Sequence, residues 1–302
     1  MPAGPVLQVD SLTKVFRRSV TAVQDLSFTV TPGRVTGFLG PNGSGKTTTL
    51  RCLLGLVRPT SGRALIQDHP YAQLRNPVST VGAALEASGF HPGRTARNHL
   101  RVVAAAAGLP EARADEVLEV VGLTQDARRR AVEFSLGMRQ RLALASALLG
   151  EPGALILDEP ANGLDPEGIA WLRTYLRDWA TRGGTVLVSS HVLSEVQQTV
   201  DDVVIINHGQ LVHAGPLAGL SAAGGPRVIL RSPNHERLTE LLRAAAPGVT
   251  ASARPDGSID VTGLTAAEVG HVAFAGGCEL HELAAEPDAL ERVFLDLTGG
   301  AG

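Results

Sequence analysis

The segment that decides the fold is residues 40–47, GPNGSGKT, which follows an apolar run at 34–39 and opens a helical pattern at Lys46. It fits the pattern G-x-x-x-x-G-K-[ST], in which a glycine-rich turn joins a buried strand to a helix. Glycines let successive backbone N–H groups turn inward around an anion, and the helix N-terminus adds the positive end of its dipole. The sequence therefore predicts a phosphate-binding loop. Its candidate binding residues are Gly40, Pro41, Asn42, Gly43, Ser44, Gly45, Lys46, Thr47 and Thr48.

Two side chains in this loop indicate a nucleoside triphosphate with its metal. We expect Lys46 to reach the β- and γ-phosphates and the Thr47 hydroxyl to hold Mg²⁺. The rest of the chain contains one other lysine, Lys14, because arginine supplies nearly all of the positive charge. A planar guanidinium does not replace a compact ammonium inside a tight loop. The expected cofactors are ATP and Mg²⁺.

Two acids follow a second apolar run, residues 154–160 (ALILDEP). The run predicts a buried strand, and the carboxyl ends of parallel strands are where such sheets bind ligands. Asp158 is therefore a second candidate metal ligand. Glu159, the next residue, is the candidate general base that orients or deprotonates the attacking water.

Strand and helix patterns alternate after residue 150, which predicts a largely parallel sheet with helices on its faces, whereas short apolar runs before residue 31 predict an antiparallel sheet. Between the two lies a stretch of helical patterns, which we interpret as a helical insert at about 87–150. The expected strands are 7–10, 26–30, 34–39, 154–157, 185–189 and 203–206, and the expected helices start at Lys46, Thr95, Pro110, Ser135, Pro166 and Leu193.

A cluster of Gly, Ala and Ser at 218–226 indicates a flexible connection and a domain boundary. We expect a nucleotide-binding domain at 1–219 and a small α+β accessory domain at 220–302. The order of patterns in the second part is βαββαβ, typical of a ferredoxin-like fold. A last helix is expected at 288–297. We expect this domain to regulate the protein or brace a dimer.

Residues 6–218 resemble an ATP-binding cassette (ABC) ATPase, a P-loop NTPase with a RecA-like core sheet, an antiparallel β subdomain and a helical insert. The family's signature, L-S-G-G-Q-x-Q-R, corresponds to residues 134–141 (FSLGMRQR), which depart from it at Phe134, Leu136 and Met138. In the family this segment closes on ATP held by the opposite subunit of a head-to-tail dimer. The resemblance thus implies nucleotide binding by Ser135, Gly137 and Gln140.

The resemblance assigns three further features. Residues 162–165 match the family's D-loop, and His191 aligns with the switch histidine that contacts the γ-phosphate and the attacking water. Phe16 occupies the place of the aromatic residue that stacks on adenine, although by itself it fits equally well in a core.

Glu86 stands where most ABC ATPases have a glutamine that joins Mg²⁺ and the attacking water to the permease interface. A carboxylate is a harder ligand for Mg²⁺ than an amide oxygen. We expect Glu86 to ligate the metal. The alternatives are that it repels the γ-phosphate or points to solvent. The following Phe90, His91 and Pro92 are candidate permease contacts.

The chain resembles drug-resistance and antibiotic-export ATPases in three features: the order of its motifs, the stretch GFHP at 89–92 and the stretch LERVFLDLTG at 290–299. This implies an ATP-hydrolysing subunit that drives a separate membrane permease, with a second nucleotide-binding subunit, a homodimer being favoured over a heterodimer. We expect a cytoplasmic protein, held on the inner face of the cell membrane through the permease.

Composition agrees with these expectations. The formal net charge is −3, so nucleic acid is not expected as a partner. Cys52 and Cys278 belong to no metal-spaced cluster, and no apolar run reaches the roughly 20 residues of a membrane-spanning helix. Two rival classes remain: a soluble ABC ATPase acting on ribosomes or DNA, and a P-loop GTPase or small-molecule kinase.

Overall fold

The computed structural model describes residues 3–17, 19–85, 89–192, 197–224, 226–254 and 256–285. The chain divides into two compact units, Met1–Leu217 and Ala218–Gly302. Each unit has its own hydrophobic core.

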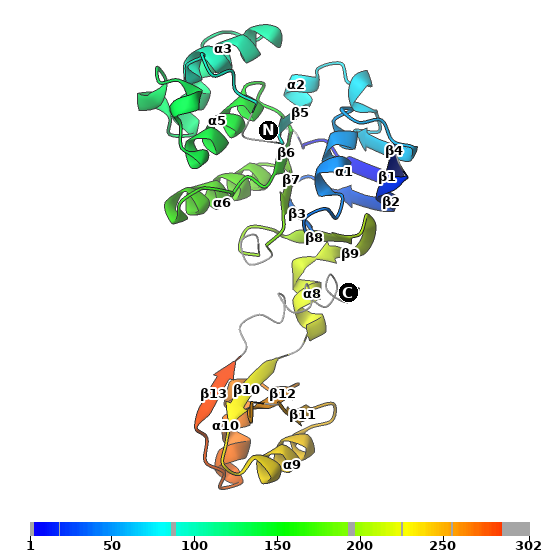
Figure 1. Ribbon diagram of the computed structural model, residues 1–302, viewed down its shortest axis with the longest axis vertical. Helices are drawn as coiled ribbons and strands as arrows, with labels where there is room; N and C mark the ends of the chain where they lie inside the picture. Colours follow the sequence, from blue (N-terminus) through cyan, green and yellow to red (C-terminus); the bar gives the residue numbers. More distant parts are fainter. Residues whose placement is uncertain are drawn as a thin grey trace. The chain divides into compact units, whose positions relative to one another are not determined.

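A six-stranded sheet forms the centre of the first unit, in the order β5-β6-β7-β3-β8-β9. Neighbouring strands are parallel except at the edge, where β9 pairs antiparallel with β8. Figure 1 shows α6 on one face of this sheet and α1 on the other. The strands are β3 (Val35–Leu39), β5 (Val81–Ala84), β6 (Ala154–Asp158), β7 (Thr185–Ser190), β8 (Asp202–Asn207) and β9 (Gln210–Pro216).

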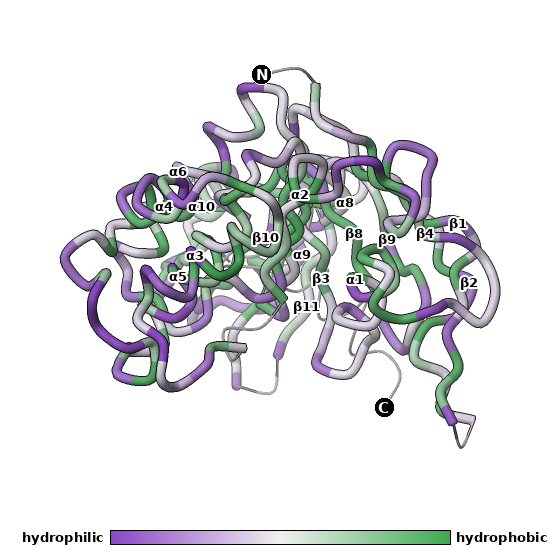
Figure 2. The backbone as a smooth tube through the Cα atoms, turned by 90° about the horizontal axis from the view of Figure 1, so that it is seen from above, coloured by the Kyte–Doolittle hydropathy of each residue, from purple (hydrophilic) through white to green (hydrophobic). Residues whose placement is uncertain are grey.

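The central strands are buried on both faces, as parallel strands covered by helices must be. Every residue of β3, β6 and β7 is buried. Figure 2 shows β3 and β8 as hydrophobic segments of the chain. Because these strands are parallel, their last residues lie side by side at the carboxyl end of the sheet. These residues are Leu39, Asp158 and Ser190. The loops that follow them therefore meet there.

A second, antiparallel sheet has the order β2-β1-β4. Its strands are β1 (Leu7–Phe16), β2 (Val20–Val30) and β4 (Ser61–Ile66), and α1 (Lys46–Leu53) follows the phosphate loop. The two expected strands, 7–10 and 26–30, are correct in type but too short. The hairpin continues through register shifts in the β1–β2 ladder, which the alternating pattern of the sequence does not reveal.

The expected helical insert contains α3 (Ala96–Ala106), α4 (Arg113–Val120) and α5 (Leu136–Leu148), and α6 (Pro166–Thr181) follows β6. Two expected N-caps are confirmed: Thr95 accepts a hydrogen bond from the Asn98 amide and Ser135 from the Met138 amide. The expected start at Pro110 is wrong, because i→i+3 turns precede α4 there. Short helical segments complete the unit: α2 (Pro77–Thr80), η1 (Tyr71–Gln73), η2 (Thr124–Asp126) and η3 (Ala131–Glu133).

Most of the expected flexible connection at 218–226 is helical, because α8 covers Leu217–Gly224. Alanine and leucine are strong helix formers and outweigh the glycines there. The expected helix at 193–199 lies partly outside the described residues, and the one at 288–297 lies entirely outside them. No helix in the described part of the chain is both long and apolar enough to cross a bilayer.

The second unit is a four-stranded antiparallel sheet in the order β11-β12-β10-β13. This is the strand order of the split βαβ, ferredoxin-like arrangement. The sequence pattern predicts the last strand at 279–283, and the observed strand begins three residues later, at Glu282. Its elements are β10 (Arg227–Arg231), α9 (His235–Ala245), β11 (Thr250–Ala253), β12 (Ile259–Thr262), α10 (Ala266–Ala275) and β13 (Glu282–Ala285).

A capping box starts α10 and gives a test of this unit. Thr265 accepts from the Glu268 amide while the Glu268 carboxylate accepts from the Thr265 amide. Thr265→Ala should cost about 1 kcal/mol and speed the hydrogen exchange of α10 amides about fivefold. Thr239→Ala within α9, where the hydroxyl only bonds back to His235, is the matched control. It removes no cap, so the hydrogen exchange of the α10 amides should stay unchanged or become slower. Equal exchange in the two variants would contradict the capping role.

Candidate nucleotide-binding site

The loop between β3 and α1 has the shape of an anion cradle. Gly45, the N-cap residue of α1, has φ +105, and a Cβ there would lie 2.4 Å from the Ala22 carbonyl oxygen. A Cβ on Gly40 would lie 2.3 Å from the Ile206 carbonyl oxygen and 2.6 Å from Ser44 Oγ. The loop therefore depends on glycine at both ends. The Ser44 hydroxyl is buried without a hydrogen-bond partner among the described residues, which fits a phosphate oxygen as its partner.

Lys46 is a buried cation inside this loop, only 6% exposed. Its Nζ donates to the carbonyl oxygens of Gly40 at 2.6 Å and Pro41 at 3.2 Å, and lies 3.7 Å from Glu159 Oε1. Burial lowers the pKa of Lys46, and the charges of Glu159 and Asp158 oppose that shift. A polyanion entering the loop would replace neutral carbonyls as partners of this charge.

The two expected metal ligands with described positions lie together. Thr47 Oγ1 donates to Asp158 Oδ2 at 2.7 Å, and Asp158, the last residue of β6, is 7% exposed. Its other oxygen accepts from Ser189 Oγ. A hydroxyl and a carboxylate are the hard oxygen donors that Mg²⁺ prefers, so the residues fit this ion. Among the described residues no group of three or more His, Cys, Asp or Glu side chains is arranged to hold a metal ion, and a metal here would need phosphate and water as further ligands.

The two expected catalytic residues are in direct contact. His191 Nδ1 lies 2.7 Å from Glu159 Oε2, with the two side chains 37% and 20% exposed. Glu159 follows β6 and His191 follows β7, so the adjacent parallel strands bring them together. The carboxylate is thus held between an imidazole and the Lys46 ammonium, facing the loop.

A cavity of about 340 Å³ covers the loop. Glu159 and His191 line it together with the phosphate loop. Its lining residues are Ala22, Asn42, Gly43, Ser44, Gly45, Lys46, Thr47, Thr48, Glu159, Asn162 and His191.

The other expected nucleotide-binding residues do not line this cavity. Phe16 is 42% exposed at the end of β1, with Lys14 Nζ 5.0 Å from its ring centroid, so it is not a core residue. Its stacking on adenine stays a prediction. Ser135, Gly137 and Gln140 belong to α5 and its cap, outside the lining of their own chain's phosphate loop.

The departures from the signature have different surroundings. Phe134 is buried beneath the Arg129 guanidinium, which lies 5.7 Å from its ring centroid. Leu136 is 47% exposed and packs against Gly163, where a Cβ would lie 2.4 Å from Leu136 Cδ2. A Cβ on Gly137 would lie 2.7 Å from the Gly163 carbonyl oxygen. The signature segment is thus packed tightly on residues 162–165 of its own chain.

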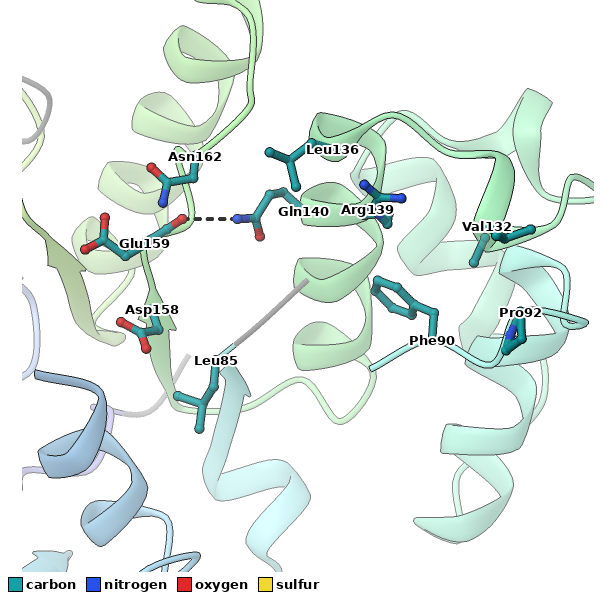
Figure 3. Close-up of a pocket in the computed structure, with 11 residues that line it drawn as sticks. Leu85, Phe90, Pro92, Val132, Leu136, Arg139, Gln140, Asp158, Glu159 and Asn162 are labelled. Atoms are coloured by element: carbon teal, nitrogen blue, oxygen red, sulfur yellow. Dashed lines mark hydrogen bonds between the residues drawn. The ribbon is translucent and has the colours of Figure 1, made fainter. Parts of the chain in front are cut away.

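A second cavity, of about 570 Å³, lies beside the acids (Figure 3). Leu85, Phe90 and Pro92 line it, with Asp158, Glu159 and Asn162 on another side. Phe90 packs edge-on against His99, with the ring centroids 4.9 Å apart. Glu86, the candidate metal ligand next to Leu85, lies outside the described residues.

Two residues of this site were not predicted from the sequence. Ser189 contacts Asp158 and the Glu159 amide, and its signal is a polar residue at the end of an apolar strand, opposite Asp158 in the ladder. Asn162 lines both cavities, and its signal is its position as the first residue of the D-loop match.

The glycine-rich loop after β3, its lysine and hydroxyl, and the acids at the end of β6 together define a P-loop nucleoside triphosphatase. The ABC transporter family model matches residues 23–162, and a domain of unknown function (DUF8746) matches residues 226–291. The bacitracin transport ATP-binding protein BcrA of Bacillus licheniformis is 35% identical over 300 residues, covering 98% of both chains. The lantibiotic transport ATP-binding protein SrtF of Streptococcus pyogenes is 34% identical over 68% of this chain and 89% of that protein.

Solved structures agree. An ATP-binding subunit of an ABC transporter superposes with a TM-score of 0.65 at 28% identity, over 72% of this chain and 92% of that one. The dimeric cassette MJ0796 shares the fold, with a TM-score of 0.64 at 21% identity over 70% and 98% of the two chains. The chain belongs to the ATP-binding proteins of ABC transporters, and it is an ATPase. The expected fold class and the resemblance to antibiotic-export ATPases are confirmed.

Two loop glycines give a matched test of the cradle. An alanine at Gly43 or Gly45 must adopt a left-handed backbone, which costs about 1–2 kcal/mol, but only at Gly45 does the new Cβ meet a carbonyl oxygen, whereas at Gly43 nothing lies within 4 Å. Gly45→Ala should therefore weaken ATP binding far more than Gly43→Ala, measured with a fluorescent ATP analogue. ATP affinities in the reverse order would contradict the loop geometry.

Proposed function

We propose that this chain is the ATP-hydrolysing subunit of an exporter of antibiotics or other hydrophobic compounds and drives a separate membrane permease. The observation that carries the proposal is the contact of Lys46, Glu159 and His191 at the phosphate loop. The names of BcrA and SrtF, a bacitracin and a lantibiotic transport ATP-binding protein, support the class of cargo. The permease would hold the chain on the cytoplasmic face of the membrane.

In this proposal each residue of the site has one task. Lys46 and the loop amides bind the β- and γ-phosphates of ATP. Thr47 and Asp158 would hold Mg²⁺, which would neutralise phosphate charge, and Glu86 stays a candidate third ligand. The Glu159 carboxylate accepts a proton from the attacking water, and His191 holds that carboxylate in place through its Nδ1 contact.

A second nucleotide-binding subunit completes the proposed site. Ser135 and Gly137 lie outside the lining of their own chain's loop, and Ser135 is exposed at the N-terminus of α5. A helix N-terminus with a capping hydroxyl is a ready anion site. Two copies arranged head to tail would each present this segment to the ATP of the other, and closure around two nucleotides would move the permease.

The division of labour follows the two units. We propose that residues 1–219 are the nucleotide-binding domain and that 220–302 are an accessory domain that regulates or braces the dimer. All the residues that line the cavity over the phosphate loop lie in the first unit, Met1–Leu217. Phe90 and Pro92, beside the second cavity, are the proposed contacts of the permease.

Glu159→Gln tests the catalytic assignment, because the amide keeps the shape of the side chain but cannot accept the proton. Steady-state ATP turnover should fall at least about 100-fold while ATP still binds. The control Glu119→Gln changes an exposed acid on α4 and should leave turnover unchanged. Full turnover in Glu159→Gln would remove Glu159 from the role of base.

Copurification tests the partner. An affinity-tagged chain, extracted in detergent from its native host, should bring down an integral membrane protein with several spanning segments. The untagged chain, taken through the same extraction, controls for nonspecific capture and should bring down no membrane protein. Recovery of ribosomal particles or nucleic acid in place of a membrane protein would favour a soluble ABC ATPase and contradict the transport proposal.

A further inference from the structure

Glu159 has an unusual backbone. Its φ is +50, in the left-handed region that residues with a side chain rarely adopt. Such conformations persist where the surrounding structure over-determines them, and they are concentrated at functional sites. The contacts of the Glu159 main chain therefore decide where its carboxylate points.

Three groups hold that main chain. The Glu159 N–H donates to Ser189 Oγ at 2.9 Å, and the Glu159 carbonyl oxygen accepts from Gln140 Nε2 at 3.1 Å (Figure 3). The same carbonyl oxygen accepts from the Asn162 N–H at 3.2 Å. Ser189 ends up fully buried near the end of β7, and Gln140 comes from α5, so two separate elements hold the residue.

The Ser189 hydroxyl contacts both acids. Because its oxygen accepts from the Glu159 amide, its one proton is free for Asp158 Oδ1, to which it donates. The other oxygen of Asp158 accepts from Thr47. A continuous chain of hydrogen bonds thus runs from the phosphate loop through Asp158 and Ser189 to the backbone of Glu159.

The held backbone places the Glu159 carboxylate next to two groups of the site. Glu159 Oε2 lies 2.7 Å from His191 Nδ1, and Oε1 lies 3.7 Å from Lys46 Nζ. A change of the Glu159 backbone to the ordinary right-handed or extended region would swing the side chain away from both groups. General-base catalysis requires the base within hydrogen-bond reach of the water it activates.

We propose that Ser189 and Gln140 are positioning residues for ATP hydrolysis: they hold the Glu159 backbone in its left-handed conformation and so aim the carboxylate at the phosphate loop. This inference rests on the proposed role of Glu159 as the base. Neither residue needs to touch the attacking water, because each acts through the main chain of Glu159.

The first measurement separates turnover from binding in the full chain. Ser189→Ala and Gln140→Met remove the two side-chain partners, and kcat should fall at least about tenfold, since misplacing a reacting group by about 1 Å can cost 100-fold. The Kd for ATP should stay within about twofold in Ser189→Ala, because no contact of Lys46 or the loop is removed. Thr185→Val is the matched control: it removes a buried hydroxyl, bonded to the Pro5 carbonyl, from the start of the same strand. It should lower the melting temperature as Ser189→Ala does and leave kcat unchanged.

The second measurement is a double-mutant test. If Ser189 acts only by aiming the carboxylate of Glu159, then adding Ser189→Ala to Glu159→Gln should not reduce the residual single-turnover rate further. If it acts by holding the fold, the two losses should multiply.

The outcomes are distinct. A lower kcat in Ser189→Ala with unchanged ATP affinity, and no further loss in the double variant, supports the proposal. Unchanged kcat in both single variants, or multiplying losses, overturns it while leaving Glu159 as the base. Full turnover in Glu159→Gln alone instead overturns the proposed catalytic role on which the inference rests.

Discussion

The rest of the site depends on one constraint, the burial of a positive charge at the start of α1. The Lys46 ammonium lies inside the phosphate loop, where two backbone carbonyls and the Glu159 carboxylate satisfy it. A buried charge is tolerated only when it is paired and hydrogen-bonded. The Gly40 and Pro41 carbonyls must therefore approach the ammonium closely. The loop is also packed against other segments, because a Cβ at Gly40 or Gly45 would meet the carbonyl oxygen of Ile206 or Ala22. An anion brought to the loop meets a charge that is already desolvated, which strengthens their attraction.

The parallel sheet places the remaining chemistry around that charge. β3, β6 and β7 are adjacent and end at one edge, so the loop, the two acids and His191 are neighbours although they lie far apart in the sequence. The strands themselves are apolar and fully buried, and the polar groups appear where each strand ends. The packing of the strands in the core therefore fixes the distances between the catalytic groups.

Local sequence determined what could be predicted. The phosphate loop, the acids after β6 and the caps Thr95 and Ser135 depend on neighbouring residues, and the sequence predicts each of them. The length of the β1–β2 hairpin and the start of α4 were predicted wrongly, because bulges and turns change the hydrophobic pattern too little. The helix α8 was missed because its glycines indicated a loop, although its alanines and leucines favour a helix. The contacts of Ser189 and Gln140 with Glu159 join residues 30 and 19 positions apart, so only the fold reveals them. Phe16 lies at the end of β1, beyond the expected strand 7–10, and no described contact ties it to the loop.

In the proposed function, ATP joins two copies of this chain, each of which completes the nucleotide site of the other. The most direct test is the mass of the Glu159→Gln chain in solution, measured by light scattering with and without ATP and Mg²⁺. The account predicts that the nucleotide shifts the mass from 31.5 kDa to twice that value, and that Lys46→Met abolishes the shift. A mass that does not respond to saturating ATP, in a chain that still binds it, would contradict the account.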